Sequence, residues 1–327
     1  MSKVEELLDT SLIQPGKRAK IIRTDAIEQK INVYIWDMDE TLILLKSLLN
    51  GTYAEAFNGS KDVQKGNEIG RMWEGHLLHV CDEYFFYEQI ENCNKPSLDA
   101  LSDYDDGRDL SDYDFGKDRF TSPCDDPSRR KLAYRYRVIA HKYVQGLRTV
   151  LDEERMKLWD DLYHQTDIYT DRWLSSARVF LEQSVERCKI LNANLASSHE
   201  LTHSLDSKSQ NIHVLVTSGS LVPSLVKCLL FRLDGLITHQ NVYSSRDVGK
   251  PHCFSLIKER FSGSNVQFCV IGDGWEECEA AEAMKWPFVK IGFRPGSSHK
   301  FPGLTLRTVD HYISVIYENS DVAKDEL

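Results

Sequence analysis

Residues 33–41 read Val33-Tyr34-Ile35-Trp36-Asp37-Met38-Asp39-Glu40-Thr41, an apolar run that stops at two carboxylates one residue apart. Because residues 32–36 are rich in β-branched and aromatic side chains, they predict a buried strand. Asp37 then falls at the carboxyl end of that strand. Ligands bind at this end of the strands in open α/β sheets. The stretch therefore predicts an α/β fold with a site at Asp37.

The two acids of this stretch would point to the same side if the strand continued, so their mutual repulsion must be offset. A nearby cation or a shared proton would do this, and the sequence leaves both open. One chemistry that uses such a pair is a magnesium site with an attacking carboxylate, since magnesium prefers oxygen ligands.

The composition is that of a globular protein, because 28% of the 327 residues are charged and 41% are hydrophobic. The formal net charge of -10 argues against a nucleic-acid-binding surface. We therefore expect no direct nucleic acid binding, and an anionic substrate would need a local positive site. The eight cysteines form no C-x-x-C pair, which indicates neither a zinc ribbon nor a disulfide framework.

No apolar run reaches membrane-spanning length, and the N-terminus has no signal-peptide core. We therefore expect a cytoplasmic or nuclear protein without membrane contact, and the basic residues 17–23 are a candidate nuclear import signal. The chain ends in Lys324-Asp325-Glu326-Leu327, an endoplasmic-reticulum retention sequence. Because its receptor reads it only in the lumen, we expect this sequence not to function here.

The first half of the chain predicts a polar N-terminal extension, residues 1–30, and a mainly helical insertion, residues 47–205. Apolar side chains recur at helical spacing in three parts of the insertion. The residues expected to face inward are Ile69, Met72, Trp73, Leu77, Val80, Tyr84, Trp159, Leu162, Tyr163, Trp173, Leu174, Val179 and Leu181. The insertion would form a cap over the rest of the fold.

The second half of the chain alternates short apolar runs with helical segments, which is typical of parallel α/β sheets. The expected strands are residues 212–216, 236–242, 266–271 and 288–291, and the expected helices are residues 221–232 and 252–261. The isolated first strand needs these strands as partners. We therefore predict a discontinuous, Rossmann-like core built from residues 31–46 and 206–327.

Two short patterns suggest other chemistries but fail on their surroundings. His199-Glu200-Leu201-Thr202-His203 matches the zinc-protease pattern H-E-x-x-H, yet its setting is polar and no third ligand follows. Cys124 and Arg130 have the C-x5-R spacing of cysteine-dependent tyrosine phosphatases. Residues 125–127 between them bring two aspartates and a proline, which add negative charge and remove a backbone donor. We expect neither site.

The set that survives lies at the ends of predicted strands and the starts of predicted helices. Its members are Asp37, Asp39, Thr217, Lys250 and Asp273, with Glu276 and Glu277 shortly after. Three carboxylates can hold a divalent ion, while a hydroxyl and an ammonium neutralise phosphate oxygens. Together they predict a phosphoryl-transfer site.

At these residues the chain resembles the haloacid dehalogenase superfamily, whose first motif D-x-D-x-T is matched by residues 37–41. Within that superfamily it is similar to the Eyes absent protein tyrosine phosphatases over nearly the whole chain, residues 31–317. The likeness is carried by residues 36–41 (WDMDET), 109–115 (DLSDYDF), 131–137 (KLAYRYR) and 271–277 (IGDGWEE). The long N-terminal transactivation region of the animal proteins is missing, which favours a plant-type homologue made of the catalytic domain alone.

The resemblance implies a haloacid dehalogenase-like core with a helical cap, and a Mg2+-dependent phosphatase that acts through an aspartyl-phosphate. Asp37 would be the nucleophile, and it would bind the metal together with Asp273 and the backbone carbonyl of Asp39. The Asp39 side chain would carry the proton. The residues implied to bind the phosphoryl group are Thr217, Ser218 and Lys250, and those implied to support the metal site from behind are Thr41, Glu276 and Glu277.

The implied substrate is a protein that contains phosphotyrosine. The resemblance is also compatible with a nuclear protein partner. Two other functions stay open on the residues. One is a phosphatase of the same superfamily that acts on small metabolites, since related catalytic cores serve both. The other is a transcription-associated scaffold with vestigial activity. The chain departs from the family pattern in two places. Residues 218–220 replace a segment richer in threonine, and Trp275 replaces a smaller residue, which would change the rim around the substrate.

Overall fold

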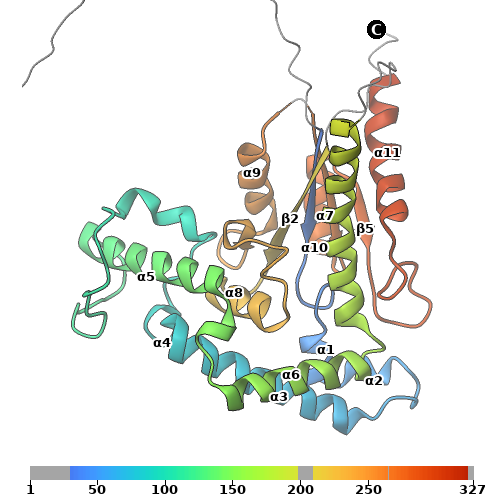
Figure 1. The fold of residues 1–327 in the computed structure, drawn as a ribbon. Coiled ribbons are helices and arrows are strands. Elements are labelled where there is room, and N and C mark those ends of the chain that lie inside the picture. The colour runs from blue at the N-terminus through green and yellow to red at the C-terminus, as the bar shows by residue number, and fades with distance from the viewer. Residues whose placement is uncertain (1–29, 198–208, 264, 323–327) are drawn as a thin grey trace, which may run out of the picture.

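The computed structural model describes residues 30–197, 209–263 and 265–322, which are drawn in colour in Figure 1. Several features of the sequence lie outside these residues. They are residues 1–29 of the N-terminal extension with the basic stretch at 17–23, the H-E-x-x-H pattern at 199–203 and the C-terminal retention sequence. Among the helices that the structure describes, none is long and apolar enough to cross a membrane.

Parallel strands form a five-stranded sheet in the order β3-β2-β1-β4-β5. Their bounds are β1 Lys30–Trp36, β2 Ser209–Thr217, β3 Val242–Ser244, β4 Val266–Gly272 and β5 Phe288–Lys290. The apolar β1 lies in the middle, where both of its faces are covered. Trp36 pairs with Leu215 of β2 on one side and with Ile271 of β4 on the other. The predicted α/β fold with a parallel sheet is confirmed, and the carboxyl ends of these three strands lie side by side.

One predicted strand is wrong in extent. The sequence predicts a strand over residues 236–242, whereas β3 covers Val242–Ser244. The amide of Ile237 donates to the carbonyl of Leu233, which closes a turn, and a short 3-10 helix, His239–Asn241, follows. The apolar run is therefore a turn that packs into the core. Periodicity alone does not separate such a turn from a short strand.

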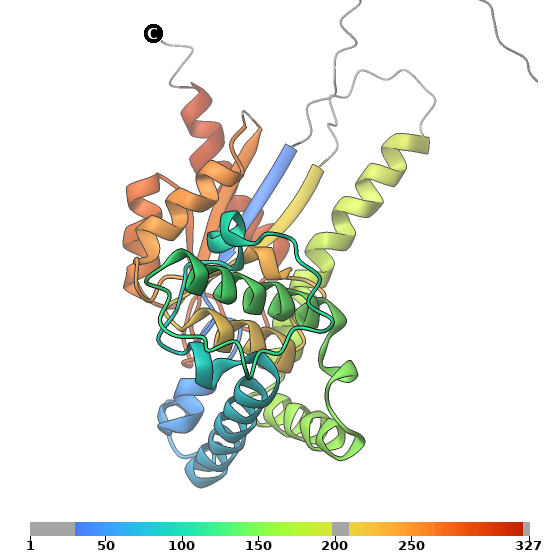
Figure 2. The same ribbon diagram turned by 90° about the vertical axis from the view of Figure 1, so that its left-hand side faces the viewer.

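Helices cover both faces of the sheet. They are α7 Trp173–Ser197, α8 Leu221–Leu230, α9 Lys250–Arg260, α10 Trp275–Met284 and α11 Leu306–Val322. Because side chains alternate along a strand, Tyr34 and Trp36 share a core with α7 and α11, while Val33 and Ile35 share one with α9 and α10. Figure 2 shows α7 and α9 on opposite sides of β1 and β2. The site at the strand ends therefore sits on a three-layer scaffold.

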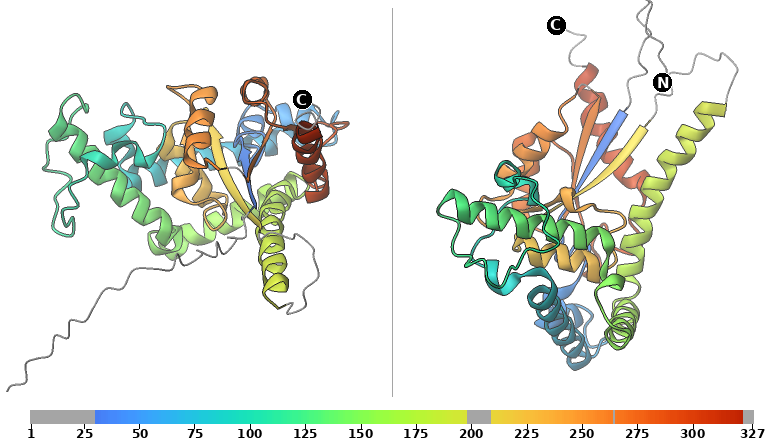
Figure 3. Two further views of the ribbon diagram at one scale, coloured as in Figure 1. Left: turned by 90° about the horizontal axis from the view of Figure 1, so that it is seen from above. Right: turned by 60° about the vertical axis from the view of Figure 1, so that its left-hand side comes forward.

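The segment between β1 and β2 is mainly helical, as predicted. Its helices before α7 are α1 Leu45–Leu49, α2 Thr52–Glu55, α3 Val63–Phe85, α4 Tyr87–Ile90, α5 Asp126–Gln145 and α6 Glu153–Tyr169, with 3-10 helices at Leu98–Tyr104 and Leu147–Thr149. Figure 3 shows α5 extending away from the sheet. By contrast α7, which lies within the predicted insertion of residues 47–205, packs against β2. The domain boundaries stay a prediction.

Two side chains expected to face inward are exposed. Met72 is 48% exposed and Val179 is 45% exposed. Each is next to the residue that fills the core, Trp73 on α3 and Phe180 on α7. Successive residues of an α-helix point about 100° apart, so the neighbour of a buried aromatic residue can lie outside the apolar stripe. The apolar character of Met72 and Val179 made the predicted stripes too wide.

Candidate active site

Asp37 directly follows β1 and stays in the hydrogen-bond ladder of the sheet, because its amide donates to the carbonyl of Ile271 at 2.9 Å. The residue is 8% exposed, and Lys250 Nζ lies 2.7 Å from Asp37 Oδ1. Lys250 is the first residue of α9. Gly249 before it has a φ of 79°, a left-handed conformation that glycine adopts without strain. This turn brings the ammonium group of Lys250 to the end of β1.

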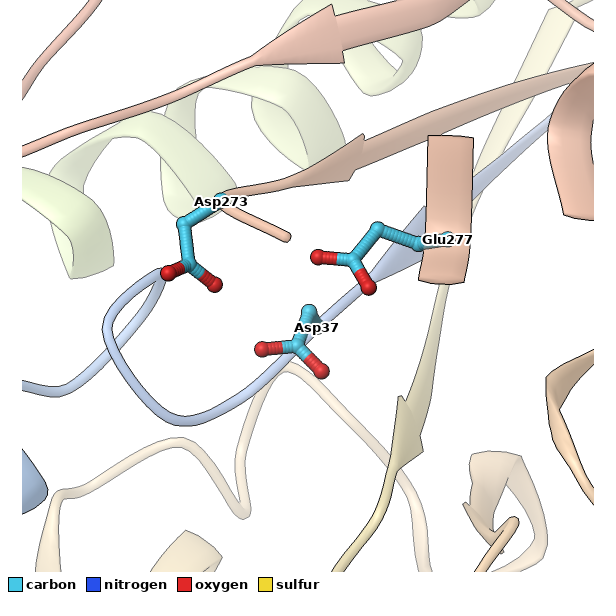
Figure 4. A group of neighbouring side chains, drawn as sticks. All are labelled: Asp37, Asp273 and Glu277. Atoms are coloured by element: carbon cyan, nitrogen blue, oxygen red, sulfur yellow. The ribbon is translucent and has the colours of Figure 1, made fainter. Parts of the chain in front are cut away.

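Three carboxylates converge beside the ends of β1 and β4 (Figure 4). Oxygen atoms of Asp37, Asp273 and Glu277 lie within 4.8 Å of one another. Asp273 directly follows β4, and Glu277 lies in the first turn of α10. Magnesium and calcium are bound by several oxygen ligands around one point. These three residues, called the carboxylate trio below, could therefore hold a divalent cation.

The carboxylate trio is electrostatically crowded. Burial raises the pKa of Asp37 to about 7, Lys250 opposes this rise, and Glu277 and Asp273 add to it. Burial and the charge of Glu277 also raise the pKa of Asp273. Lys250 lies 2.6 Å from Glu277 as well as 2.7 Å from Asp37, so one ammonium group serves two acids. Burial opposes the charge on Lys250, but the two acids raise its pKa overall. A further positive charge is favoured here.

Asp39 has a lysine of its own. Lys227 Nζ lies 2.8 Å and 2.9 Å from the two carboxylate oxygens of Asp39, which is not part of the carboxylate trio. Lys227 belongs to α8, an otherwise mainly apolar helix that begins shortly after Thr217. Lys227 is not among the site residues predicted from the sequence. The signal that could have identified it is a single cation in an apolar helix next to a predicted phosphate-binding threonine.

The two predicted phosphate-binding residues of β2 and its loop differ in exposure. Thr217 ends β2 and is 1% exposed, and its Oγ1 accepts a hydrogen bond from the amide of Gly219 at 3.2 Å. Ser218 is exposed and lines the same pocket as Asp37. The helix α8 begins at Leu221, and the amides of a helix N-terminus attract anions. Ser218 therefore faces the pocket, while Thr217 shapes the loop beneath it.

The residues expected to support the metal site also occupy different positions. Glu277 is buried, and its carboxylate accepts hydrogen bonds from Lys250 and from the amide of Gly274. Glu276 is exposed and lines the pocket. Thr41 is fully buried, and its carbonyl accepts a hydrogen bond from the indole of Trp173 at 3.1 Å. The Glu277 carboxylate thus lies next to Asp37 and Asp273, whereas Thr41 connects the loop after β1 to α7 through this hydrogen bond.

A pocket of about 460 Å3 opens over these groups. Its polar and charged lining consists of Asp37, Asp39, Glu40, Lys46, Ser218, Lys227, Lys250, Asp273, Glu276 and Glu277. Trp275 stands at its rim and is 70% exposed. The structure thus brings together carboxylates, ammonium groups and a hydroxyl that are distant in sequence. Such a set suits the binding of a phosphoryl group beside a divalent ion.

No family model matches the chain. Among curated proteins, protein phosphatase EYA of Arabidopsis thaliana is 61% identical over 291 residues, which cover 89% of this chain and 92% of that protein. Protein phosphatase eya of Drosophila melanogaster is 33% identical over 82% of this chain and 34% of its own length. Human protein phosphatase EYA2 is 31% identical over 79% of this chain and 47% of its own length. The chain spans less than half the length of these two animal relatives.

Proposed function

Because the chain belongs to the Eyes absent family of protein phosphatases, we propose that it removes phosphate from tyrosine residues of proteins through an aspartyl-phosphate. The observation that carries this proposal is the ion pair of Asp37 and Lys250, which are 2.7 Å apart at the carboxyl end of β1. Asp273, which follows β4, lies beside this pair. A carboxylate attacks phosphorus only when it is ionised, and Lys250 favours the ionised form of Asp37.

In the first step a carboxylate oxygen of Asp37 forms a bond to phosphorus while the bond to the tyrosyl oxygen breaks. Lys250, Thr217 and Ser218 hold phosphoryl oxygens, and the hydrogen bond that Thr217 accepts from Gly219 also fixes the loop that presents Ser218. The N-terminus of α8 adds the positive end of a helix dipole on the same side. These contacts orient the phosphoryl group in line with Asp37.

Asp39 carries the proton in both steps. It gives a proton to the tyrosyl oxygen as that group leaves. It then takes a proton from the water that attacks phosphorus in the aspartyl-phosphate, which breaks the bond between Asp37 and phosphorus and releases phosphate. Lys227 contacts both carboxylate oxygens and so sets the orientation of Asp39. A tyrosyl group has a pKa of about 10, well below that of an alkyl alcohol, so it places a smaller demand on Asp39. This supports tyrosine as the substrate residue.

We propose Mg2+ as the cofactor, held by the carboxylates of Asp37 and Asp273 and by the backbone carbonyl of Asp39. When bound, the ion supplies positive charge that offsets the phosphoryl oxygens. The crowded carboxylate trio, with the pKa values of Asp37 and Asp273 raised, supports this choice. Both oxygens of Glu277 have partners within the protein. We therefore assign Glu277 to holding Lys250, with Glu276 at the rim of the pocket.

Phosphate release from phosphotyrosyl peptides, with Mg2+ and with EDTA, tests the proposed function. We expect release to require Mg2+, and we expect Asp37→Asn to lower kcat by about a thousandfold or more because the nucleophile is lost. Asp161→Asn is the matched control, since Asp161 is exposed on α6 and far along the chain from the site residues. Retention of most activity by Asp37→Asn, with circular dichroism unchanged, would refute the assignment.

Rates on three kinds of substrate decide the substrate class. We expect higher kcat/KM on phosphotyrosyl peptides than on phosphoseryl peptides or on a panel of small phosphorylated metabolites. A preference for a metabolite of more than about tenfold would instead identify a metabolite phosphatase. Tight binding of a protein partner without any Mg2+-dependent hydrolysis would identify a scaffold.

A further inference from the structure

A second pocket adjoins the carboxylate trio on the side of the sheet where β5 lies. It encloses about 640 Å3 and shares Asp273 with the pocket of the candidate active site. Its walls come from β5, from the loop after β5 and from Tyr312 of α11. In Figure 1, β5 and α11 lie on the right of the sheet, while α5 lies on the left. Because Asp273 lines both pockets, they lie next to each other at the end of β4.

The lining of the second pocket is basic, although the protein as a whole is acidic. Lys290 and Arg294 are exposed and His299 is half-buried. Among the described residues that line the pocket, Asp273 alone is acidic, and it belongs to the carboxylate trio. The formal net charge of the chain is -10. Local positive charge on an acidic protein indicates a negatively charged ligand.

The loop that carries these cations is held in one shape. The amide of Gly292 donates to the carbonyl of His299 at 3.0 Å, which closes the loop at its base. Inside it, the amide of Ser297 donates to the carbonyl of Arg294 at 3.1 Å. The ring of Phe293 packs against a tyrosine of α2. Because the backbone is already ordered, binding to this loop costs less conformational entropy.

We propose that this basic pocket binds acidic residues of the substrate protein that lie within a few positions of the phosphotyrosine. The proposal rests on the proposed function, to which it adds the class of sequence around the target tyrosine. An extended peptide advances about 3.3 Å per residue. A peptide whose phosphotyrosine is bound at Asp37 and whose backbone runs past Asp273 would therefore place residues a few positions away in the pocket that Lys290 and Arg294 line. Aspartate and glutamate side chains pair well with arginine and lysine.

Binding and turnover of charged peptides test this proposal separately from the chemistry. Labelled phosphotyrosyl peptides carry three acidic or three basic residues. These residues stand either before or after the phosphotyrosine, so each placement gives one pair of an acidic and a basic peptide. Fluorescence anisotropy gives their affinity for the full chain with Asp37→Asn, in which turnover is blocked. We expect the acidic peptide of one of the two pairs to bind about fivefold to twentyfold more tightly than its basic counterpart, as a few exposed ion pairs allow.

The salt dependence distinguishes the pocket from the overall charge of the protein. Salt screens exposed charges over a distance of about 10 Å at 0.1 M. If the pocket binds the acidic residues, added salt weakens binding of the acidic peptide. If the net charge of -10 dominates, the acidic peptide is repelled and added salt strengthens its binding. The second result would overturn the proposal.

The double variant Lys290→Glu with Arg294→Glu should abolish or invert the preference for acidic over basic peptides, with the change in KM rather than in kcat. Lys157→Glu with Lys258→Glu is the matched control, because it changes the net charge equally at exposed positions outside both pockets. An equal shift in the control, or no effect of the flanking residues in the wild type, would refute the proposal. A binding preference without hydrolysis of any phosphotyrosyl peptide would instead support the proposal and count against the proposed function.

Discussion

The two aspartates that follow β1 are each paired with a lysine from a different helix. Asp37 contacts Lys250 at the start of α9, and Asp39 contacts Lys227 within α8. The sequence left open whether a cation or a shared proton offsets the repulsion between the two carboxylates, and the structure supplies two ammonium groups. Because the two aspartates have separate lysine partners, their surroundings differ. Asp37 lies in the buried carboxylate trio, while Asp39 is more open to solvent.

The variant Lys227→Met tests whether Lys227 positions Asp39, the proposed proton carrier. Methionine keeps much of the apolar stem, so α8 should remain folded. We expect the rate of the first turnover of phenyl phosphate, whose leaving group needs a proton, to fall about tenfold to a hundredfold, since a well-placed general acid contributes at least that much. For 2,4-dinitrophenyl phosphate, whose leaving group needs no proton, the fall should stay below about threefold. Rapid-quench measurement of the first turnover gives both rates.

Lys227→Arg is the conservative variant for this measurement, because it keeps a cation beside Asp39 and should recover most of the lost rate. A purely structural role would predict equal losses on both substrates. Equal losses in Lys227→Met, with no recovery in Lys227→Arg, would therefore contradict a positioning role.

The candidate site could be predicted from the sequence where its residues lie at the ends of elements. Asp37, Asp273 and Lys250 stand where apolar runs stop or helices start, and parallel strands bring such ends together. Lys227 could not be predicted in the same way, because its contact with Asp39 depends on how α8 packs across the end of the sheet. The closeness of Glu277 to Asp37 likewise depends on the first turn of α10.

At the scale of a single strand, β2 carries a histidine inside the core. His213 is 2% exposed, its Nδ1 accepts a hydrogen bond from the indole of Trp36 at 3.1 Å, and its ring stacks on Tyr34. Burial lowers the pKa of His213 to about 4. The folded protein therefore keeps this histidine neutral at a pH where the unfolded chain would protonate it.

This difference predicts how stability changes with pH. The folded pKa is lowered from 6.5 to about 4, so the contribution of His213 is present above pH 6.5 and is lost as the pH falls toward 4. The loss amounts to about 3 kcal/mol over that window. In His213→Asn, whose amide oxygen can still accept from Trp36, the free energy of unfolding should fall less steeply. Urea unfolding at several pH values measures it.

The exposed His141 on α5 supplies the control for this pH series. His141→Asn should leave the pH dependence of stability unchanged, because the side chain of His141 lies on the surface of α5 and outside the core. A His213→Asn variant whose stability falls as steeply as that of the wild type between pH 6.5 and 4 would show that His213 does not make this contribution.

Secondary-structure elements could be predicted from the sequence where one pattern dominates. Strands β1, β2 and β4 and the helices of the insertion follow their apolar patterns closely. The pattern failed where the tertiary fold decides, since residues 236–241 form a turn that packs into the core and Met72 and Val179 point outward. In these cases the apolar character of a side chain favours burial but does not establish it.

At the scale of the whole molecule, a bound metal should stabilise the fold. The carboxylate trio places acids in the folded chain closer together than in the unfolded chain, so a divalent ion that binds only the folded state raises its stability by mass action. Mg2+ at about a hundred times its dissociation constant would add about 3 kcal/mol. We expect Mg2+ to raise the thermal midpoint of the wild type by a few degrees at pH 8.

The variant Asp273→Asn should remove most of this gain, while Asp161→Asn on the surface of α6 should keep it. Differential scanning calorimetry with Mg2+ and with EDTA measures the shift without any substrate. A thermal midpoint that does not respond to Mg2+ in the wild type would count against the proposed metal site, whatever the activity.

The central place of β1 has a consequence for the order of events during synthesis. This strand ends at Trp36, its neighbour β2 begins at Ser209, and its other neighbour β4 begins at Val266. At about 5 to 20 residues per second, a ribosome needs roughly ten to thirty seconds to make the intervening 170 residues or so. During that delay the apolar β1 has no pairing partner, whereas the helices between β1 and β2 can form their local contacts. A chaperone that shields β1 on the nascent chain would therefore act before Asp37, the proposed nucleophile, has a scaffold.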